Sequence, residues 1–181
     1  HDRALSKSEL IEFLKQDRYD AVLCLLTDKI DGDIFDAAGK QCKIFANYAV
    51  GFDNVDLEAA KERGVMITNT PEVPTETVAE YTFALILSIA HRIAEADRFS
   101  RAGKYKGWEP EFLLGSDVSG KTLGIVGLGR IGSLVAHHAA KGFGMRVIYF
   151  DVRRNENFEK EVGAELRTGV DDVFREGDFV S

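Results

Sequence analysis

Hydrophobic residues along the chain fall into two alternating patterns. Continuous apolar runs, typical of strands buried in a sheet, occupy residues 21–26, 43–46, 65–68, 122–126 and 146–150. Apolar residues spaced three or four positions apart predict helices at residues 6–16, 34–38, 56–63, 76–100 and 131–139. The end of the chain predicts a short strand at 165–167, a helix at 170–175 and the start of a strand at 178–181. Strands that alternate with helices indicate an α/β fold with parallel sheets and right-handed crossovers.

The longest predicted helix, residues 76–100, is apolar on nearly all sides from Tyr81 to Ala90. This composition is typical of a helix that is buried on several sides. A position between two domains or two subunits explains it, and a central place within one domain explains it equally well. Residues 103–120, which follow, are rich in glycine and aromatic residues and predict a surface connection.

The strand at 122–126 leads directly into a glycine-rich turn. Its sequence is Gly127-Leu128-Gly129-Arg130-Ile131-Gly132, which has the spacing G-x-G-x-x-G. In a dinucleotide site the first glycine allows a tight turn, the second admits a pyrophosphate, and the third lets helix and strand pack closely. The backbone amides at the helix start, near Arg130 and Ile131, would hold the phosphate charge. The turn therefore predicts a dinucleotide-binding unit.

An acidic residue ends the second strand of this unit. Asp151 lies about 20 residues beyond Gly132, the spacing of the carboxylate that accepts a hydrogen bond from a ribose 2′-hydroxyl. A carboxylate repels a 2′-phosphate, so NAD is favoured over NADP. Arg153 and Arg154 follow and are able to hold a phosphate, which keeps NADP as the less favoured alternative. A glycine-rich turn in an ordinary α/β domain explains the motif less well, because strand, helix and acid all occupy the required places.

The chain has 181 residues and a formal net charge of -7, without a long block of lysine or arginine. That length suits one or two domains, and nucleic acid or an anionic membrane is not expected as a partner. No apolar stretch reaches the ~18 residues of a membrane span. Cys24 and Cys42 lie in or beside apolar runs, without the spacing of metal ligands. We therefore expect two reduced thiols in or near the core, no metal site and a cytoplasmic location.

Four sequence motifs follow one another along the chain. Residues 47–56 read NYAVGFDNVD, residues 68–73 read TNTPEV, residues 77–80 read TVAE, and residues 120–132 read GKTLGIVGLGRIG. In this order they resemble the D-isomer-specific 2-hydroxyacid dehydrogenases, and within them the glyoxylate and hydroxypyruvate reductases. One such motif is weak evidence, whereas four in the same order are strongly specific.

The resemblance implies two α/β domains, both truncated in this chain. A flavodoxin-like substrate domain would occupy residues 1–97, without its first strand and with a long interdomain helix at 76–100. The first half of a Rossmann dinucleotide-binding domain, with NAD as cofactor, would occupy residues 98–181. Relatives pair across their Rossmann domains, which implies a homodimer. Phe112 matches an aromatic residue that in some relatives reaches towards the partner's active site, and its alternative role is to anchor the surface connection.

Positions that match the family's motifs imply a substrate site and a cofactor site. The loop at Val50 and Gly51 would hold the substrate carboxylate by backbone amides, since a glycine leaves such an anion cradle open; a plain turn glycine is the alternative. Val78 would lie near the nicotinamide. Pro74 stands where glyoxylate reductases often carry leucine, so the substrate preference stays open. NADP-preferring relatives tend to lack the acid at position 151 and carry arginine next, whereas Val152 follows the acid here.

Hydride reduction of a 2-keto acid needs a proton donor, and a cation near the carbonyl and the carboxylate. The family supplies a histidine paired with a glutamate, and an arginine, all downstream of the position of Ser181. The histidines present lie outside the matching motif: His1, His91, His137 and His138. We expect His91 to be packed or on a helix surface, and His137 and His138 to face solvent. This chain is therefore expected to contain no catalytic residue, and to be an internal fragment that is inactive alone.

The resemblance implies an NAD-dependent oxidoreductase that interconverts a small D-2-hydroxy acid and its 2-keto acid, such as glycolate and glyoxylate or glycerate and hydroxypyruvate. An NAD(H)-sensing binding protein, like the transcriptional corepressors of this fold, is a second interpretation, although no peptide-docking surface is evident. Another dehydrogenase of the superfamily, acting on phosphoglycerate, formate or phosphite, is a third.

Overall fold

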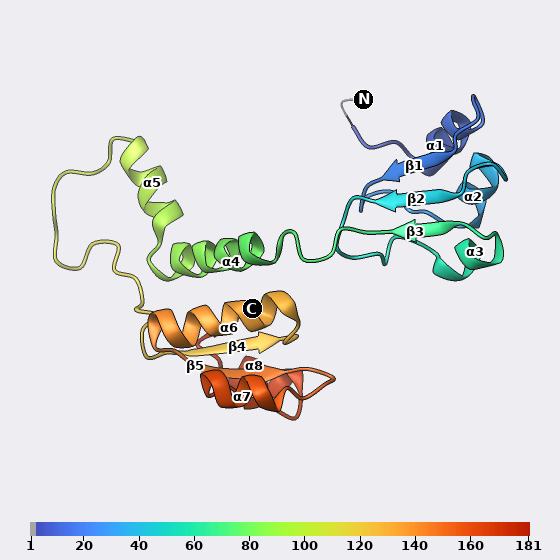
Figure 1. Ribbon diagram of the computed structural model, residues 1–181. Helices are drawn as coiled ribbons and strands as arrows, with labels where there is room; N and C mark the ends of the chain where they lie inside the picture. Colours follow the sequence, from blue (N-terminus) through green and yellow to red (C-terminus); the bar gives the residue numbers. More distant parts are fainter. Residues whose placement is uncertain (1–2) are drawn as a thin grey trace. The chain divides into compact units, whose positions relative to one another are not determined.

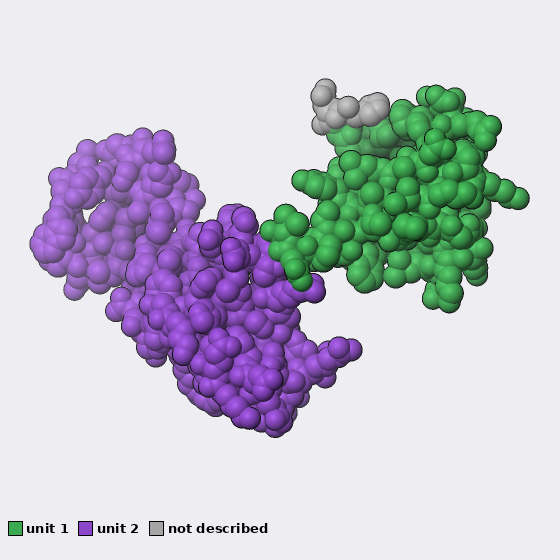
Figure 2. Space-filling view, viewed as in Figure 1, with its two compact units in different colours: residues 1–73 green, residues 74–181 purple. Residues whose placement is uncertain are grey.

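A computed structural model of the protein describes residues 3–181. The chain separates into two compact units, of which one ends at Val73 and the other runs from Pro74 to Ser181 (Figure 2). Each unit contains a parallel β-sheet and a hydrophobic cluster of its own. The predicted α/β class with parallel sheets is therefore confirmed.

The first unit is a three-stranded sheet with helices between its strands (Figure 1). Its parallel strands lie in the order β1 (Ala21–Cys24), β2 (Ile44–Asn47) and β3 (Met66–Thr68). Its helices are α1 (Lys7–Leu14), α2 (Gly32–Ala38) and α3 (Leu57–Glu62). All six elements appear where the sequence pattern predicted them, with ends that differ by one or two residues.

Local chemistry explains why these elements begin and pack where they do. Ser6 caps α1 and forms a capping box with Glu9, and the Asp56 side chain accepts a hydrogen bond at the start of α3. The ring of Phe45, which is fully buried on β2, meets Phe35 of α2 edge-on, with 5.0 Å between centroids. Alternate side chains of β2 point into the core, so this strand holds the unit together.

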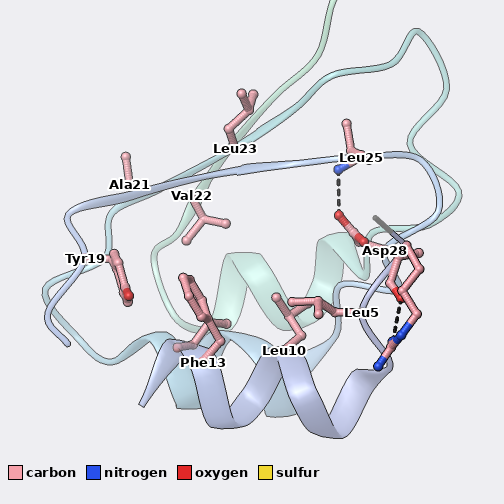
Figure 3. A pocket seen from close by; sticks show the side chains of 12 residues that line it. Leu5, Leu10, Phe13, Tyr19, Ala21, Val22, Leu23, Leu25 and Asp28 are labelled. Carbon is pink, nitrogen blue, oxygen red and sulfur yellow. Dashed lines mark hydrogen bonds between the residues drawn. The ribbon is translucent and has the colours of Figure 1, made fainter. Parts of the chain in front are cut away.

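The strand β1 forms an edge of the sheet. Within residues 3–181 no other strand pairs with its outer side. An apolar groove runs between α1 and β1, and Figure 3 shows Leu10 and Phe13 of the helix facing Val22 of the strand across it. On the other face of β1 the Leu23 side chain is 73 % exposed. The outer edge of β1 is thus unpaired within the described residues.

The second unit contains a four-stranded parallel sheet. Its strands are β4 (Thr122–Val126), β5 (Arg146–Phe150), β6 (Glu165–Leu166) and β7 (Phe179–Val180), in the order β6-β5-β4-β7. Its helices are α4 (Thr75–Ala90), α5 (Ile93–Arg101), α6 (Arg130–Phe143), α7 (Glu156–Val162) and α8 (Val170–Glu176). Numbered from β4, this order is 3-2-1-4, that of the Rossmann fold up to the first strand of its second half. The strand order reverses beside β4, which places a switch point at the end of that strand.

Three helical features differ from the sequence-based expectation. The helix predicted at 76–100 is two helices, because Arg92 adopts a left-handed conformation with φ 55°. The returning chain ends α4: the N–H of Ser116 donates to the Ala90 carbonyl at 2.8 Å. A Cβ on Gly115 would lie 2.2 Å from that same oxygen, so the chain crosses the helix end at close range. The whole of α4 belongs to the second compact unit, whereas the substrate domain was predicted to extend to residue 97.

The third difference is α7, which the hydrophobic pattern did not predict. Asn155 caps it by accepting from the N–H of Phe158, and Gly163 ends it in a left-handed conformation. Both end signals are present in the sequence, but the helix has only seven residues and no buried side chain. A short helix of this kind produces almost no apolar periodicity.

Both cysteines are free and buried, as predicted. None of the helices described in residues 3–181 combines the length and the apolar character needed to cross a membrane.

Candidate nucleotide and anion sites

The glycine turn lies between β4 and α6 at the carboxyl end of the sheet. Gly127 has φ 96°, and its N–H donates to the Phe150 carbonyl at 2.8 Å, which ties the turn to the end of β5. A Cβ on Gly132 would lie 2.1 Å from the Gly127 carbonyl oxygen, so only glycine permits this approach of helix and strand. The space beside Gly129 is open to 4 Å. The three glycines therefore stand in the three environments that a pyrophosphate cradle requires.

The helix that follows is suited to an anion. Gly129 occupies the cap position of α6, and no side chain of the described residues caps this helix. The first N–H groups of a helix have no intrahelical partner and carry a partial positive charge. Arg130 and Ile131 open the helix here, so the amide groups face the place where a pyrophosphate would lie. The cradle and the helix start together fit a dinucleotide.

Asp151 is drawn into the same turn. The N–H of Arg153 donates to its Oδ1 at 2.9 Å, and the N–H of Leu128 donates to its Oδ2 at 2.6 Å. These bonds, the one from Arg153 first, hold the pKa of the Asp151 carboxyl below its ordinary value. The structure thus joins the acid and the glycine turn, which are far apart in sequence, into one ionised site.

The two arginines after Asp151 have different surroundings. Arg154 pairs with Glu159 of α7 at 2.8 Å, and the same carboxylate accepts from the hydroxyl of buried Tyr149 at 2.8 Å. This arrangement, led by the bond from Arg154, lowers the pKa of Glu159. The Arg153 side chain is exposed. Of the two cations that kept NADP as the less favoured alternative, Arg154 is thus engaged by a neighbouring helix.

The second candidate site is the loop after β2 in the first unit, where Val50 and Gly51 lie. Each of its three successive carbonyls accepts a hydrogen bond. The Ala49 oxygen accepts from the backbone N–H of Thr70 at 2.9 Å, the Val50 oxygen from Asn69 at 2.8 Å, and the Gly51 oxygen from Asn47 at 2.9 Å. Among the described residues, no hydrogen bond engages the N–H groups of Val50, Gly51 or Phe52. A run of unpaired amides at the carboxyl ends of parallel strands is suited to a carboxylate.

The asparagines behind this loop were not assigned a role from the sequence. Asn47 is 1 % exposed, and its side chain also exchanges hydrogen bonds with Asn54 at 3.1 and 3.2 Å. Asn54 in turn donates to the carbonyls of Leu25 and Asp28 after β1. A polar residue at the end of an apolar run, as Asn47 is, was the one sequence signal that could have pointed to this network.

The other predicted site residues are placed as follows. Val78 lies in the first turn of α4, 36 % exposed, in the same unit as the glycine turn. His91 ends α4 and is exposed. Phe112 packs on Phe99 of α5 with 4.8 Å between ring centroids, which is the anchoring role considered for it.

The expectation that His137 and His138 face solvent holds only in part, and the His137 side chain is 42 % exposed. Both are half-buried on α6, because α4 and α7 pack beside that helix. His137 Nδ1 lies 3.3 Å from Glu161 of α7, and His138 meets the ring of Phe83 of α4 edge-on. Their contacts are with packing partners and not with the glycine turn.

A parallel sheet with this strand order, a glycine cradle at the switch point and an acid at the end of the next strand define a nucleotide-binding α/β protein of the Rossmann class. The model of the D-isomer specific 2-hydroxyacid dehydrogenase catalytic domain matches residues 1–175. The chain belongs to this family.

Individual relatives agree with the family assignment. The chain is 52 % identical over 177 residues to a glyoxylate reductase of Korarchaeum cryptofilum, and 49 % identical over 165 residues to one of Thermococcus kodakarensis. These matches cover 97 % and 89 % of this chain but 52 % and 49 % of the relatives, so it spans about half their length.

Solved structures give the same result for the fold. A protein of Thermus thermophilus, 40 % identical, superposes with a TM-score of 0.87 over 98 % of this chain and 54 % of its own. The D-lactate dehydrogenase of Aquifex aeolicus, complexed with NAD and lactic acid, is 29 % identical, with a TM-score of 0.80 over 94 % of this chain and 49 % of its own. The predicted pair of a flavodoxin-like and a Rossmann-type α/β fold is thus confirmed, as is its incompleteness relative to these chains.

Proposed function

We propose that the full-length protein is an NAD-dependent oxidoreductase that interconverts a small D-2-hydroxy acid and its 2-keto acid, of the glyoxylate or hydroxypyruvate reductase type. The observation that carries this proposal is the glycine turn closed by Asp151, in a chain 52 % identical to a glyoxylate reductase. The two units would have separate roles. The loop of residues 49–52 in the first unit, called the anion loop below, would receive the substrate, and the second unit would hold the cofactor.

In the second unit the residues would bind and orient NAD. The bound cofactor accepts or donates the hydride. The amides at Gly129, Arg130 and Ile131 would hold the pyrophosphate, with Gly127 and Gly132 shaping the turn and Val78 near the nicotinamide. The ionised Asp151 carboxylate would accept from a ribose hydroxyl and repel a 2′-phosphate. The pairing of Arg154 with Glu159 supports NAD over NADP, because the paired Arg154 does not offset the repulsion between Asp151 and a 2′-phosphate.

In the first unit the unpaired amides of Val50 and Gly51 would hold the substrate carboxylate. Backbone N–H donors stabilise an anion without a titratable group, so the site would bind a carboxylate at any pH at which that carboxylate is ionised. A Cβ at position 51 would lie 3.1 Å from the Asp53 carboxylate, so glycine avoids a close contact within the loop itself. This loop selects for the acid group common to all 2-hydroxy acids, and the remainder of the substrate would be selected elsewhere.

The proton donor and the cation would come from outside residues 1–181. His137 and His138 contact packing partners and His91 is exposed, and none of the three contacts the glycine turn or the loop at Val50 and Gly51. The 181-residue chain alone is therefore expected to bind NADH without turnover. We also propose a homodimer for the full-length protein, and the cytoplasm as its location, which agrees with its two buried free thiols.

The direct test is NADH oxidation at 340 nm, with glyoxylate and hydroxypyruvate, by the full-length gene product beside the 181-residue chain. Turnover by the full-length protein alone is expected. Turnover by the short chain would mean that an acid within it performs the proton transfer. NADH-dependent binding of a partner protein, without turnover of any keto acid, would favour a nucleotide-sensing binding protein instead.

Cofactor preference is tested by Asp151→Ser in the full-length protein, with fluorescence titrations of NADH and NADPH. A hydrogen bond to a charged group contributes about 1.5–3 kcal/mol, so NADH affinity should fall roughly tenfold to hundredfold. NADPH affinity should not fall, because its phosphate loses a repulsive neighbour. The control is Asp171→Ser, which removes an exposed carboxylate of α8 and should leave both affinities unchanged. An equal loss of NADH and NADPH affinity in Asp151→Ser would contradict the assigned role.

A further inference from the structure

The anion loop is stabilised by contacts that fix the direction of each of its peptide groups. The carbonyls of Ala49, Val50 and Gly51 each accept one hydrogen bond, at 2.8–2.9 Å. Two of the three donors are asparagine side chains, Asn69 after β3 and Asn47 at the end of β2. The loop therefore depends on side-chain donors where a sheet would use backbone donors.

The consequence for the amides follows from peptide geometry. Every peptide bond in the described chain is trans, so the N–H of each unit points opposite to its C=O. With the Val50 carbonyl turned towards Asn69, the N–H of Gly51 points away from Asn69. With the Gly51 carbonyl turned towards Asn47, the N–H of Phe52 points away from Asn47. The asparagines thus turn the unpaired N–H groups of Gly51 and Phe52 away from their own side chains, and a ligand would meet these groups there.

We infer that Asn69 and Asn47 are positioning residues for substrate: by holding two carbonyls they pre-orient the Gly51 and Phe52 amides towards the substrate carboxylate. This inference rests on the proposed function and extends it in two ways. It adds the Phe52 amide to those of Val50 and Gly51, and it assigns a cause to the orientation of the loop. Pre-orientation matters because a bound anion then does not have to order the backbone first.

The two asparagines differ in the number of other contacts that their side chains make. Asn47 is fully buried, and its side chain also interacts with Cys24 and Asn54, so its removal would disturb the core of the unit. Asn69 is half-buried, and the one hydrogen bond of its side chain goes to the Val50 carbonyl. Asn69 is therefore the position at which loop orientation can be changed with little effect on packing.

The test uses Asn69→Asp in the full-length gene product. The substitution keeps the shape of the side chain but replaces the donor by an oxygen, which repels the Val50 carbonyl. The expected result is a rise of about tenfold in KM for glyoxylate and in the inhibition constant of oxamate. The kcat and the dissociation constant of NADH should change less than twofold, because the amides hold the carboxylate equally before and during reaction.

A matched control separates loop orientation from general destabilisation. Ser6→Ala removes the cap of α1 in the same unit and costs about 1 kcal/mol without touching the loop. It should lower the melting temperature and leave KM unchanged. If Ser6→Ala raised KM as much as Asn69→Asp does, or if Asn69→Asp left KM unchanged in an active enzyme, the positioning role would be refuted.

A second measurement keeps the inference distinct from the proposed function. In protein labelled with 15N at glycine, oxamate should shift the Gly51 amide resonance of the wild type, and this shift should be lost in Asn69→Asp. An enzyme that is inactive towards every 2-keto acid but shows this pattern would refute the proposed function and retain the anion site. An active enzyme whose Gly51 resonance responds equally in both proteins would refute the positioning role alone.

Discussion

Substitution of Gly132 by alanine tests the close approach on which the glycine turn depends. The new Cβ would lie 2.1 Å from the Gly127 carbonyl oxygen and 3.2 Å from its carbonyl carbon. These are backbone atoms of the turn, so no side-chain rotation relieves the overlap. Forcing extra volume into a packed contact costs about 1–3 kcal/mol. Alanine regains up to about 1 kcal/mol of helix propensity, so we expect a net loss of about 1–2 kcal/mol.

The same helix offers a control of identical chemistry. Gly142 lies in α6, and a Cβ there would meet no atom within 4 Å. Gly142→Ala should therefore stabilise the unit by about 0.5–1 kcal/mol, the usual gain in a helix interior. The two substitutions thus have predicted effects of opposite sign.

Native-state hydrogen exchange of residues 122–150 measures these effects within the second unit, and NADH titration measures the turn itself. Gly132→Ala should lower the free energy of opening and weaken NADH binding, because the turn must move to admit the methyl group. Gly142→Ala should raise the free energy of opening and leave NADH binding unchanged. If Gly132→Ala proved as stable as Gly142→Ala, with normal NADH affinity, the close-packing argument would be wrong.

Three further predictions concern stability. The Arg146 guanidinium, with Arg167, lowers the pKa of Glu165 to about 2, below its unfolded value of about 4.3. Its stabilisation is therefore present at neutral pH and lost as the pH falls from about 5 to about 2. Because this carboxylate is 47 % exposed, we expect Glu165→Gln to cost at most about 1 kcal/mol at pH 7 and to flatten the acid limb of a urea-unfolding series. Tyr149→Phe removes a buried hydroxyl that bonds Glu159 and the N–H of Asn155, and should cost about 1–2 kcal/mol by the same assay. Phe45→Ala should cost about 3–5 kcal/mol in the first unit, since this ring is fully buried; a cost below 1 kcal/mol would show that the core collapses around it.

Much of the fold was readable from local pattern. The apolar runs placed β1 to β5, and the spacing of Gly127, Gly129 and Gly132 predicted both the turn and its relation to strand and helix. These features are local, because a buried strand needs continuous apolar residues and a close backbone approach needs glycine. The motifs around Val50 and Gly51 added the family and the expectation of an anion site.

Other features depend on residues that are distant in sequence. The break at Arg92 has no glycine or proline to announce it, and it occurs where the chain at Gly115 and Ser116 crosses the end of α4. Likewise, no local pattern states that Asn69 will reach the Val50 carbonyl, 19 residues earlier in the chain. Sequence by itself determined most of the strands and helices and the glycine turn, because local sterics and burial periodicity decide these. Tertiary structure alone decided which carbonyls are held and which amides stay unpaired, because hydrogen-bond partners are chosen by proximity in the folded chain.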